Sequence, residues 1–364
     1  MKRAAYLTPL YFDEVSHLGG GERYPLNLAK AVAATGEYEV DLVSYGDVTS
    51  VQRTPLAAGV TLQVLPAAKR GPDAETLSWD IISAVGAADV VHIHQIFSRP
   101  SEVAMLVAKL FDKPVCATDH GGASSRLGES LGMLDFADRI VSNSHFGASL
   151  IRTEKPVDVI PGGVDDGFFV PVAPRQGRDR VVFVGRLLPH KGVDRLIAAL
   201  PPDVPLTICG RPYDERYYQL LLALAAGRRV EFITDASDED LRDLYSRAIA
   251  VVLPSVYIDC YGTPQAWPEL MGLALLEGMA CGAPAICSRV GGMPEYVDHG
   301  KTGFVFDELA ELTEYLQLLA ADNDLVEAIG ARARQQVSDS YGLASAGAAM
   351  RSIYDELTES SAAA

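Results

Sequence analysis

Short apolar runs alternate with segments of helical period along the first half of the chain. Runs of this length that are rich in Val, Ile and Leu are typical of strands buried in a parallel sheet. Because helical segments lie between several of them, the alternation predicts an α/β domain with helices on both faces of the sheet. The predicted strands are Ala4–Leu7, Glu39–Ser44, Thr61–Leu65, Val90–Ile93, Val115–Thr118 and Arg139–Ser142, and the helices include Tyr24–Ala34 and Ser101–Leu110.

The second half restarts this pattern after Phe169–Asp179, a stretch rich in Pro, Gly and charge in which we expect a linker. Its predicted strands are Val181–Val184, Pro205–Cys209, Arg229–Ile233, Ala250–Leu253, Ala285–Ser288 and Phe304–Phe306, and its helices are Val193–Leu200, Tyr217–Ala226, Asp238–Ser246 and Leu270–Ala280.

The two patterns indicate two tandem doubly wound domains, residues 1–168 and residues 179–342. Ligands of such sheets bind outside the carboxyl ends of the strands, so we expect the ligand loops of both domains to face a shared cleft. Residues 343–364 form a terminal segment. We expect Leu343–Glu359 to be a helix that packs back on the first domain, and residues 360–364 to be a frayed end.

Composition narrows the function classes. The 364 residues carry 31 basic and 48 acidic side chains, a net charge of -17, which disfavours nucleic acid and anionic lipid as main partners. The five cysteines show no CxxC spacing, so they indicate neither a disulfide framework nor a zinc site. The N-terminal residues are typical of a strand rather than a signal peptide, and no apolar window approaches the ~20 residues of a membrane span. We therefore expect a cytoplasmic protein without a transmembrane anchor.

Three consecutive glycines, Gly19, Gly20 and Gly21, stand between the first predicted strand and the first helix. Glycines at this place let backbone amide groups approach an anion at a helix N-terminus, although a flexible turn explains them equally well. The dinucleotide-binding spacing GxGxxG does not occur in the chain. A dinucleotide-dependent oxidoreductase therefore loses its main support.

A second candidate site is VGRLLPHKG, which follows the first strand of the second domain and contains Arg186 and Lys191. Both residues come after the carboxyl end of that strand, where ligands bind in such folds. A guanidinium together with an ammonium suits a diphosphate, and two solvated surface charges are the alternative.

A third candidate is the run ELMGLALLE between Glu269 and Glu277, which we expect to form a buried helix that ends near Gly282 and Pro284. A carboxylate at each end of a buried apolar run is costly without polar partners. Helix rise would place the two about 12 Å apart, which exceeds the roughly 5–9.5 Å between the paired carboxyl groups of glycoside hydrolases. The spacing favours a pair that grips two ends of one extended ligand, with two exposed helix ends as the alternative.

A fourth candidate is His120 in TDHGG, at the carboxyl end of a first-domain strand, where it can face the cleft unless it is a capping or core histidine. His92 and His94 share one face of a strand. Because no third ligand is evident, we interpret these two as structural and expect no metal site.

Taken together, these segments resemble the retaining family 4 glycosyltransferases, whose GT-B architecture has two Rossmann-like domains. The likeness covers nearly the whole chain and includes GGGER, DVVHIH, ATDHGG, ADRIVSNS and VIPGGVD in the first half. VGRLLPHKGVDRLI, the Glu269–Glu277 pair, CGAPAICSRVGGMPEYV and HGKTGFVF follow in the second half, and the order of these four is a specific combination.

The resemblance implies roles for residues of the first, acceptor-side domain. Gly20 and Gly21 would line the phosphate and acceptor side, and His120 would contact the transferring sugar and assist at the reaction centre.

It also implies roles in the second domain, which would bind the nucleotide sugar. Arg186 and Lys191 would hold the donor diphosphate, Glu269 would bind hydroxyl groups of the donor sugar, and Glu277 would hold the ribose hydroxyl groups. Further donor-binding positions are the helix start at Met271, Gly272 and Leu273 and the base-bordering residues Gly210 and Arg211.

The chain departs from the family pattern at three neighbours of these positions. Met271 stands where a Phe is common, Gly278 where an Ala is common, and His190 where a Glu is common. The segment Val256–Pro268 also looks longer than the usual link into the first Glu. Its aromatic rings make it a candidate sugar platform, with a packed loop as the alternative. The rings belong to Tyr257, Tyr261 and Trp267.

We therefore expect an enzyme that moves a hexose, with retention, from a UDP- or GDP-sugar to a hydroxyl of a small-molecule, glycan or lipid-linked acceptor. Arg186, Lys191 and helix-terminal amide groups would stabilise the leaving diphosphate, so no metal or other cofactor is required. Two alternatives are a nucleotide-sugar epimerase of similar fold and a non-catalytic nucleotide-sugar-binding protein. The paired charges argue against the first, and the complete set of candidate residues argues against the second.

Overall fold

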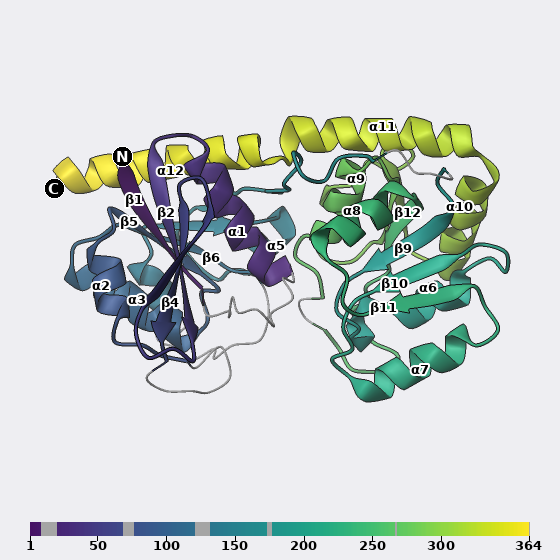
Figure 1. Ribbon diagram of the computed structural model, residues 1–364, viewed down its shortest axis with the longest axis horizontal. Coiled ribbons are helices and arrows are strands. Elements are labelled where there is room, and N and C mark those ends of the chain that lie inside the picture. The colour runs from purple at the N-terminus through teal and green to yellow at the C-terminus, as the bar shows by residue number, and fades with distance from the viewer. Residues whose placement is uncertain (9–19, 68–75, 121–131, 173–176, 266–267, 364) are drawn as a thin grey trace. The chain divides into compact units, whose positions relative to one another are not determined.

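The described chain forms two compact units. The computed structural model describes residues 1–8, 20–67, 76–120, 132–172, 177–265 and 268–363. The first unit consists of Met1–Gly163 and Leu343–Ala364, and the second consists of Val164–Gly342 (Figure 1).

The first unit is an α/β unit. Its strands are β1 (Lys2–Leu7), β2 (Tyr38–Gly46), β3 (Gln52–Ala57), β4 (Val60–Pro66), β5 (Val90–His94), β6 (Val115–Thr118), β7 (Arg139–Ser142) and β8 (Val157–Val159). Its helices are α1 (Gly20–Ala33), α2 (Ile81–Gly86), α3 (Arg99–Leu110), the 3-10 turn η2 (Met133–Phe136), α5 (His145–Leu150) and α12 (Leu343–Ala363).

The strands of this unit lie in the order β3-β4-β2-β1-β5-β6-β7-β8, and every described pair is parallel except β3 with β4. All six strands expected from the sequence are present. Strand β3 was missed because its residues are mostly exposed and polar and include Pro55, which is tolerated at an edge strand. Strand β8 was missed because it is only three residues long.

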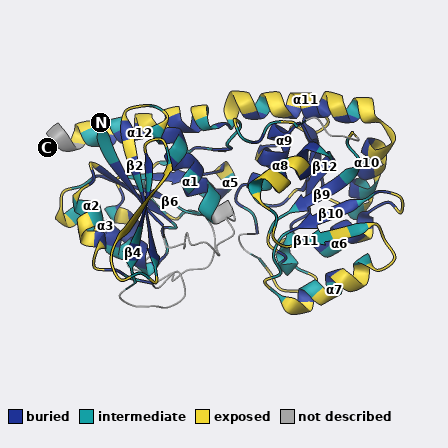
Figure 2. Ribbon diagram, in the orientation of Figure 1, coloured by how far each residue is buried: buried dark blue, intermediate teal, exposed yellow. Residues whose placement is uncertain are grey.

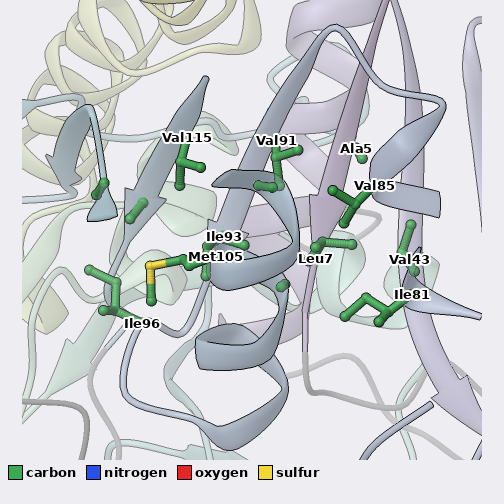
Figure 3. Packing of buried hydrophobic residues seen from close by; sticks show 14 of the residues in the cluster. Ala5, Leu7, Val43, Ile81, Val85, Val91, Ile93, Ile96, Met105 and Val115 are labelled. Carbon is green, nitrogen blue, oxygen red and sulfur yellow. The ribbon is translucent and has the colours of Figure 1, made fainter. Parts of the chain in front are cut away.

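The core of the first unit lies between its sheet and helices α2 and α3. Leu7, Val43, Val91 and Ile93 project from neighbouring strands toward Ile81, Val85 and Met105 of these helices (Figure 3). The strands are buried along their whole length at β5 and β6, as expected for a parallel sheet that is covered on both faces.

Helix α12 packs on the other side of the first unit. It contacts α1 and β5. It continues to Ala363, so the frayed end expected from residue 360 onward is wrong for residues 360–363. The hydroxyl of Tyr354 on this helix donates to the hydroxyl of Tyr6 on β1 at 2.8 Å, which anchors the helix over the sheet.

The second unit is also an α/β unit. Its strands are β9 (Arg180–Val184), β10 (Leu206–Cys209), β11 (Val230–Ile233), β12 (Ala248–Leu253), β13 (Ala285–Ser288) and β14 (Gly303–Phe306). Its helices and 3-10 turns are η3 (Pro189–Lys191), α6 (Val193–Ala199), α7 (Glu215–Ala225), α8 (Asp238–Ser246), α9 (Leu273–Ala280), η4 (Met293–Glu295), α10 (Leu309–Ala321) and α11 (Asn323–Ser340).

The sheet of the second unit has the order β11-β10-β9-β12-β13-β14, with parallel pairs throughout. The direction of winding reverses between β9 and β12, and ligands of doubly wound sheets bind at such a switch point. Strands β9, β10 and β12 are buried, whereas α7 turns an exposed face to solvent (Figure 2). The loops that follow β9 and β12 are therefore where a ligand is expected.

The chain crosses between the units at Gly163–Val164 and returns at Gly342–Leu343. The backbone N–H of Val164 donates to the carbonyl of Tyr341 at 3.0 Å, so the two crossing strands of chain are hydrogen-bonded neighbours.

The expected linker at 169–179 and the expected boundary at residue 168 differ from this division, because the structure assigns residues 164–179 to the second unit. Phe169 is the physical reason. Its side chain is 2% exposed, and its ring packs edge-on against Tyr245 with 5.9 Å between the centroids. A buried core residue ties the start of this segment to the second unit.

Among the described residues, no helix combines the length and the apolar character needed to cross a bilayer.

Candidate functional site

Two loops of the second unit, after β9 and after β10, are hydrogen-bonded to each other. The N–H of Gly185 donates to the carbonyl of Cys209 at 3.0 Å, and the N–H of Leu187 donates to the carbonyl of Arg211 at 2.9 Å. A Cβ on Gly210 would collide with the carbonyl of Gly185, so only glycine permits this approach. The structure therefore brings the predicted residues Arg186, Gly210 and Arg211 to one edge of the sheet.

The Arg186 guanidinium lies 5.9 Å from the ring centroid of Tyr213, a contact that restrains it at this edge. Tyr213 itself is 61% exposed. A guanidinium held beside a solvent-facing ring is well placed to receive an anionic ligand.

Lys191 ends the turn η3, and the next residue fixes where its side chain goes. Gly192 has a φ of 66°. A Cβ there would collide with the carbonyl of Pro254, just past β12. The N–H of Val256 also donates to the carbonyl of His190 at 2.9 Å. The turn after β9 thus packs directly on the end of β12, at the switch point of the sheet.

Lys191 and Glu269 meet at this switch point. The Lys191 ammonium forms an ion pair with Oε1 of Glu269, and the hydroxyl of Ser255 donates to the same oxygen at 3.2 Å. The lysine and glutamate side chains are only 13% and 12% exposed. The hydroxyl of Ser288 donates to the carbonyl of Ser255 at 2.6 Å, which supports the serine from β13. We call Lys191, Ser255 and Glu269 the switch-point cluster.

Glu269 does not lie on a helix, which corrects the expected helix Leu270–Ala280 and the separation derived from its rise. Helix α9 begins only at Leu273, after Gly272 with a φ of 88°. The carbonyl of Glu269 accepts from the N–H of Gly292 at 3.1 Å, and a Cβ on Gly291 would collide with it. The loop after β13 therefore holds Glu269 ahead of the helix.

The start of α9 offers backbone rather than side-chain groups. Met271 and Leu273 are buried, 5% and 7% exposed, and Gly272 has no side chain with which to cap the helix. The first amide groups of a helix have no partner within the helix, and an anion is a suitable acceptor for them.

Glu277 lies one full turn into α9 and is 2% exposed. The hydroxyl of Tyr245 donates to its Oε2 at 2.9 Å. A Cβ on Gly278 would meet Cγ2 of Val251 at 2.5 Å, so α9 and β12 approach as closely as a glycine allows. This close packing gives a physical reason for a glycine at position 278 in this chain.

In the first unit, three histidines stack at the carboxyl ends of β5 and β6. The rings of His92 and His94 lie 4.1 Å apart, and those of His94 and His120 lie 5.1 Å apart and 10° from parallel. Nδ1 of His94 and Nε2 of His120 are 2.9 Å apart, which is a hydrogen bond between the two rings. The ring of Tyr24, on α1, lies 5.0 Å from that of His120.

Burial keeps these histidines neutral at pH 7. It lowers the pKa of His92 to about 3 and that of His120 to about 3, and it holds the pKa of His94 well below its usual range. His92 is bonded to Thr118 at 2.7 Å and to the Tyr354 hydroxyl of α12, a structural role that agrees with the interpretation from the sequence.

Gly20 and Gly21 open helix α1, on which Tyr24 also lies, whereas Gly19 is outside the described residues. Within the described residues, no group of three or more His, Cys, Asp or Glu side chains is arranged to hold a metal ion.

The longer segment Val256–Pro268 is described only in part, because Trp267 lies outside the described residues. The Tyr257 hydroxyl accepts from the N–H of Gly291 at 3.0 Å, and the Arg216 guanidinium lies 4.1 Å from the ring centroid of Tyr261. Both side chains thus have contacts within the second unit, and Tyr257 is 44% exposed, so the sugar platform and the packed loop both stay open.

Sequence reasoning missed two residues of the second unit that donate hydrogen bonds to the candidate glutamates, Ser255 to Glu269 and Tyr245 to Glu277. Ser255 is the second residue after β12, so its place just after a buried strand was a signal that could have found it. Tyr245 lies on α8, 32 residues before Glu277, and no sequence pattern marks it. Burial also lowers the pKa of His190 to about 4, so it stands neutral beside the switch-point cluster.

Two family models match the chain. The model described as Glycosyltransferase Family 4 matches residues 18–168, and the model described as Glycosyl transferases group 1 matches residues 168–336.

Related proteins agree with these models. A GDP-mannose-dependent alpha-(1-6)-phosphatidylinositol monomannoside mannosyltransferase of Mycolicibacterium smegmatis is 30% identical over 64% of this chain and 64% of its own length. A D-inositol 3-phosphate glycosyltransferase of Mycolicibacterium vanbaalenii is 27% identical over 84% of this chain and 78% of its own.

A solved structure shows the same fold. The crystal structure of Anabaena HepE in complex with UDP and glucose matches 98% of this chain and 100% of its own with a TM-score of 0.74, at 19% identity. The expected GT-B fold is confirmed. Because the two family models together run from residue 18 to residue 336, the chain belongs to glycosyltransferase family 4, within the glycosyl transferases group 1, and is a glycosyltransferase that takes its sugar from a nucleotide sugar.

Proposed function

We propose that this glycosyltransferase moves a hexose from a UDP- or GDP-sugar to a hydroxyl of its acceptor, with retention of configuration at the anomeric carbon. The observation that carries the proposal is the switch-point cluster, in which Lys191, Ser255 and Glu269 converge between the loops after β9 and β12. An ammonium and a carboxylate at one point offer a charge partner for a diphosphate and an acceptor for sugar hydroxyl groups.

The diphosphate binds Arg186, Lys191 and the first amide groups of α9. Arg186 and Lys191 follow the same strand, and Gly272 leaves the amide end of the helix uncapped by any side chain. As the bond to the anomeric carbon breaks, negative charge develops on the diphosphate, and preorganised cations and amide groups stabilise it. These fixed groups supply the positive charge that a metal ion would otherwise bring to the diphosphate, so the reaction proceeds without a metal ion.

Glu269 binds hydroxyl groups of the donor sugar, and Glu277 binds the ribose hydroxyl groups. Tyr245 occupies Oε2 of Glu277, which fixes the orientation of a buried carboxylate that would otherwise be costly. Gly210 and Arg211 border the base. In the first unit, His120 contacts the transferring sugar, and Gly20 and Gly21 line the phosphate and acceptor side.

The names of the relatives support the choice of donors and widen the choice of acceptors. One relative is GDP-mannose-dependent, and HepE was crystallised with UDP and glucose. Other names give D-inositol 3-phosphate and phosphatidylinositol monomannoside as acceptors. The acceptor of this chain is accordingly a small molecule, a glycan or a lipid-linked sugar, and the cytoplasm stays the predicted location.

A donor screen tests the proposal. UDP, GDP, ADP and their glucose and mannose derivatives are added to the purified protein, and the melting temperature is measured. A ligand that binds the folded state at 100 times its Kd stabilises it by about 2.7 kcal/mol. The preferred donor is then incubated with inositol phosphates, oligosaccharides and lipid-linked sugars, and the anomeric configuration of the product is read by proton NMR.

An inverted product would contradict retention. If none of the nucleotides raised the melting temperature, the proposed donor class would be contradicted, and the switch-point cluster would have only a structural role.

A further inference from the structure

We propose that His94 is a positioning residue for His120: its Nδ1–H donates to Nε2 of His120, fixes the tautomer of His120 that carries its proton on Nδ1, and so presents Nδ1–H as a hydrogen-bond donor to a hydroxyl oxygen of the transferring sugar. The inference rests on the proposed function, in which His120 contacts that sugar.

Geometry establishes the pair. The 2.9 Å between Nδ1 of His94 and Nε2 of His120 is hydrogen-bond distance, and the two rings are 10° from parallel. His94 is 0% exposed, and the rings of His92 and Tyr6 pack against it with centroids at 4.1 Å and 4.8 Å. A side chain packed in this way cannot turn to another partner, so His94 defines where Nε2 of His120 lies.

Proton counting leaves two arrangements. Burial lowers the pKa of both rings, so each is neutral and carries one N–H and one lone pair. Either His94 donates and His120 keeps its proton on Nδ1, or His120 donates and keeps only a lone pair there. Nε2 of His94 and Nδ1 of His120 are both buried and have no hydrogen-bond partner among the described residues.

The cost of unpaired groups selects the first arrangement. When a sugar hydroxyl pairs with Nδ1 of His120, the first arrangement leaves only a lone pair on His94 without a partner. The second leaves a buried N–H on His94 without one, and orphaned buried N–H groups are the rarer case in folded proteins. His94 is therefore the donor, and His120 offers the sugar an N–H.

This assignment limits what His120 does chemically. A neutral imidazole that donates a hydrogen bond transfers no proton at pH 7, so His120 orients and polarises the sugar and is not a general acid. Its contribution depends on the tautomer, and the tautomer depends on His94.

Nitrogen NMR tests the inference directly on the protein labelled with 15N-histidine and saturated with its preferred donor, because the sugar hydroxyl is what makes the two arrangements unequal. Pyrrole-type and pyridine-type ring nitrogens have well-separated shifts, and the signals of His120 are identified by their loss in His120→Ala. We expect Nδ1 of His120 to be protonated in the wild type. In His94→Leu this preference should be lost, whereas in His92→Gln, the matched control on the same stack, it should be kept.

Kinetics test the consequence. Asparagine places an amide N–H where Nδ1 of His94 lies, so His94→Asn should keep the transfer rate within a few-fold. His94→Leu and His94→Gln should lower kcat roughly 10- to 100-fold, the range found for groups that orient an imidazole from behind in metal sites. The Kd for the nucleoside diphosphate, which binds the second unit, should stay unchanged in all three.

Protonation of Nε2 rather than Nδ1 of His120 in the wild type would overturn the inference. So would a full transfer rate in His94→Leu when His120→Ala is impaired. Full activity of His120→Ala is a different result, because it removes the sugar contact assigned to His120 under the proposed function.

Discussion

At the scale of single residues, Lys191 and Glu269 determine the state of the site before a ligand binds. Their ion pair is about nine-tenths buried and is shared with the Ser255 hydroxyl, so solvent screens it less than a surface pair. In the proposed function, a diphosphate that approaches Lys191 would compete with Glu269 for the ammonium. Lys191 would then turn to the phosphate and leave the carboxylate available to sugar hydroxyl groups, so that donor binding would replace the ion pair with two ligand contacts.

Replacing Lys191 with alanine should reduce transfer at least ~100-fold, because a preorganised charge that stabilises the leaving diphosphate is removed. The measurement is kcat/KM of the purified variant with the preferred donor. Lys301→Ala is the matched control, since Lys301 is an exposed lysine of the same unit, and it should retain full activity. Near-normal transfer by Lys191→Ala would remove the phosphate role.

The two glutamates should respond differently to loss of charge. Glu277→Gln should weaken the free nucleoside diphosphate and the complete donor alike, by roughly 1.5–3 kcal/mol, the usual value of a hydrogen bond to a charged group. Glu269→Gln should weaken the sugar-bearing donor, because the charged acceptor for the sugar hydroxyl groups is lost. It should not weaken the free nucleoside diphosphate, because Lys191 is released from the ion pair and stays available to the diphosphate. Titration calorimetry of both variants with nucleotide and donor separates the roles, and equal losses for both ligands in both variants would refute them.

At the scale of elements, the site depends on how closely α9 approaches β12. Gly278 lets the helix lie against Val251, and the same helix carries Glu277 at one point and the uncapped amide groups at its start. A small displacement of α9 would therefore move several of the groups proposed to bind the donor together. Gly192 and Gly210 allow an equally close approach in the loops after β9 and β10. The carbonyl groups of Pro254 and Gly185 lie where the Cβ atoms of other residues would be.

Gly278→Ala should destabilise the protein by about 1–3 kcal/mol, the cost of overpacking, because its Cβ would meet Val251. In an open helix the same change would stabilise by about 1 kcal/mol, so the sign of the effect reports the close approach. Urea denaturation measures it, and nucleotide affinity should fall as well.

Adding Val251→Ala to Gly278→Ala supplies the control. The second change removes Cγ1 and Cγ2 of residue 251, at 3.3 Å and 2.5 Å from the new Cβ, but keeps its Cβ at 2.9 Å, so the double variant should recover part of the nucleotide affinity. A more stable Gly278→Ala protein would show that the space between α9 and β12 accommodates a Cβ at position 278.

At the scale of the whole molecule, charge is distributed unevenly. The net charge is -17, yet Arg186, Lys191 and Arg211 follow strands at the ligand-binding edge of the second sheet. The first unit instead buries three neutral histidines, His92, His94 and His120, whose hydrogen bonds connect β5, α12, β6 and the loop after β6. Acid should therefore act on the first unit through these histidines.

Stability should fall as pH drops below 6.5. The folded-state pKa of His92 is about 3, below the unfolded value of about 6.5, so the unfolded chain binds protons first. The stability that goes with the neutral, buried form of His92 is fully present above pH 6.5 and is lost as the pH falls toward 3. At pH 5 the free energy of unfolding has decreased by about 2 kcal/mol through this residue. His94 adds in the same direction, since its pKa is also depressed.

Urea denaturation at pH 7.5, 6.5 and 5.5 measures this dependence. His92→Gln keeps an amide that can bond to its neighbours but does not titrate, so the slope of stability against pH should be smaller by up to about 1.4 kcal/mol per pH unit. An unchanged slope would show that His92 is not buried and neutral in the folded protein.

The pattern of residues along the chain was sufficient to predict the fold class and nearly all of the strands, and it singled out the loops that carry candidate ligand-binding residues. Burial of a parallel strand requires a continuous apolar run, which can be seen locally in the sequence, and the general geometry of parallel sheets places the residues after each run at one edge. Arg186, Lys191 and His120 were singled out by this rule together with the family resemblance, and Glu277 by the buried helical run that it ends.

Contacts between distant residues determined the rest. Glu269 lies outside α9 because Gly291 and Gly292 hold its carbonyl, and it meets Lys191, which is 78 residues earlier in the chain. The division between units comes before residue 168 because Phe169 is buried against Tyr245. Likewise, His94 and His120 form a pair because β5 and β6 are neighbours in the sheet. Each of these depends on which surfaces meet after folding, and periodicity along the chain carries no information about that.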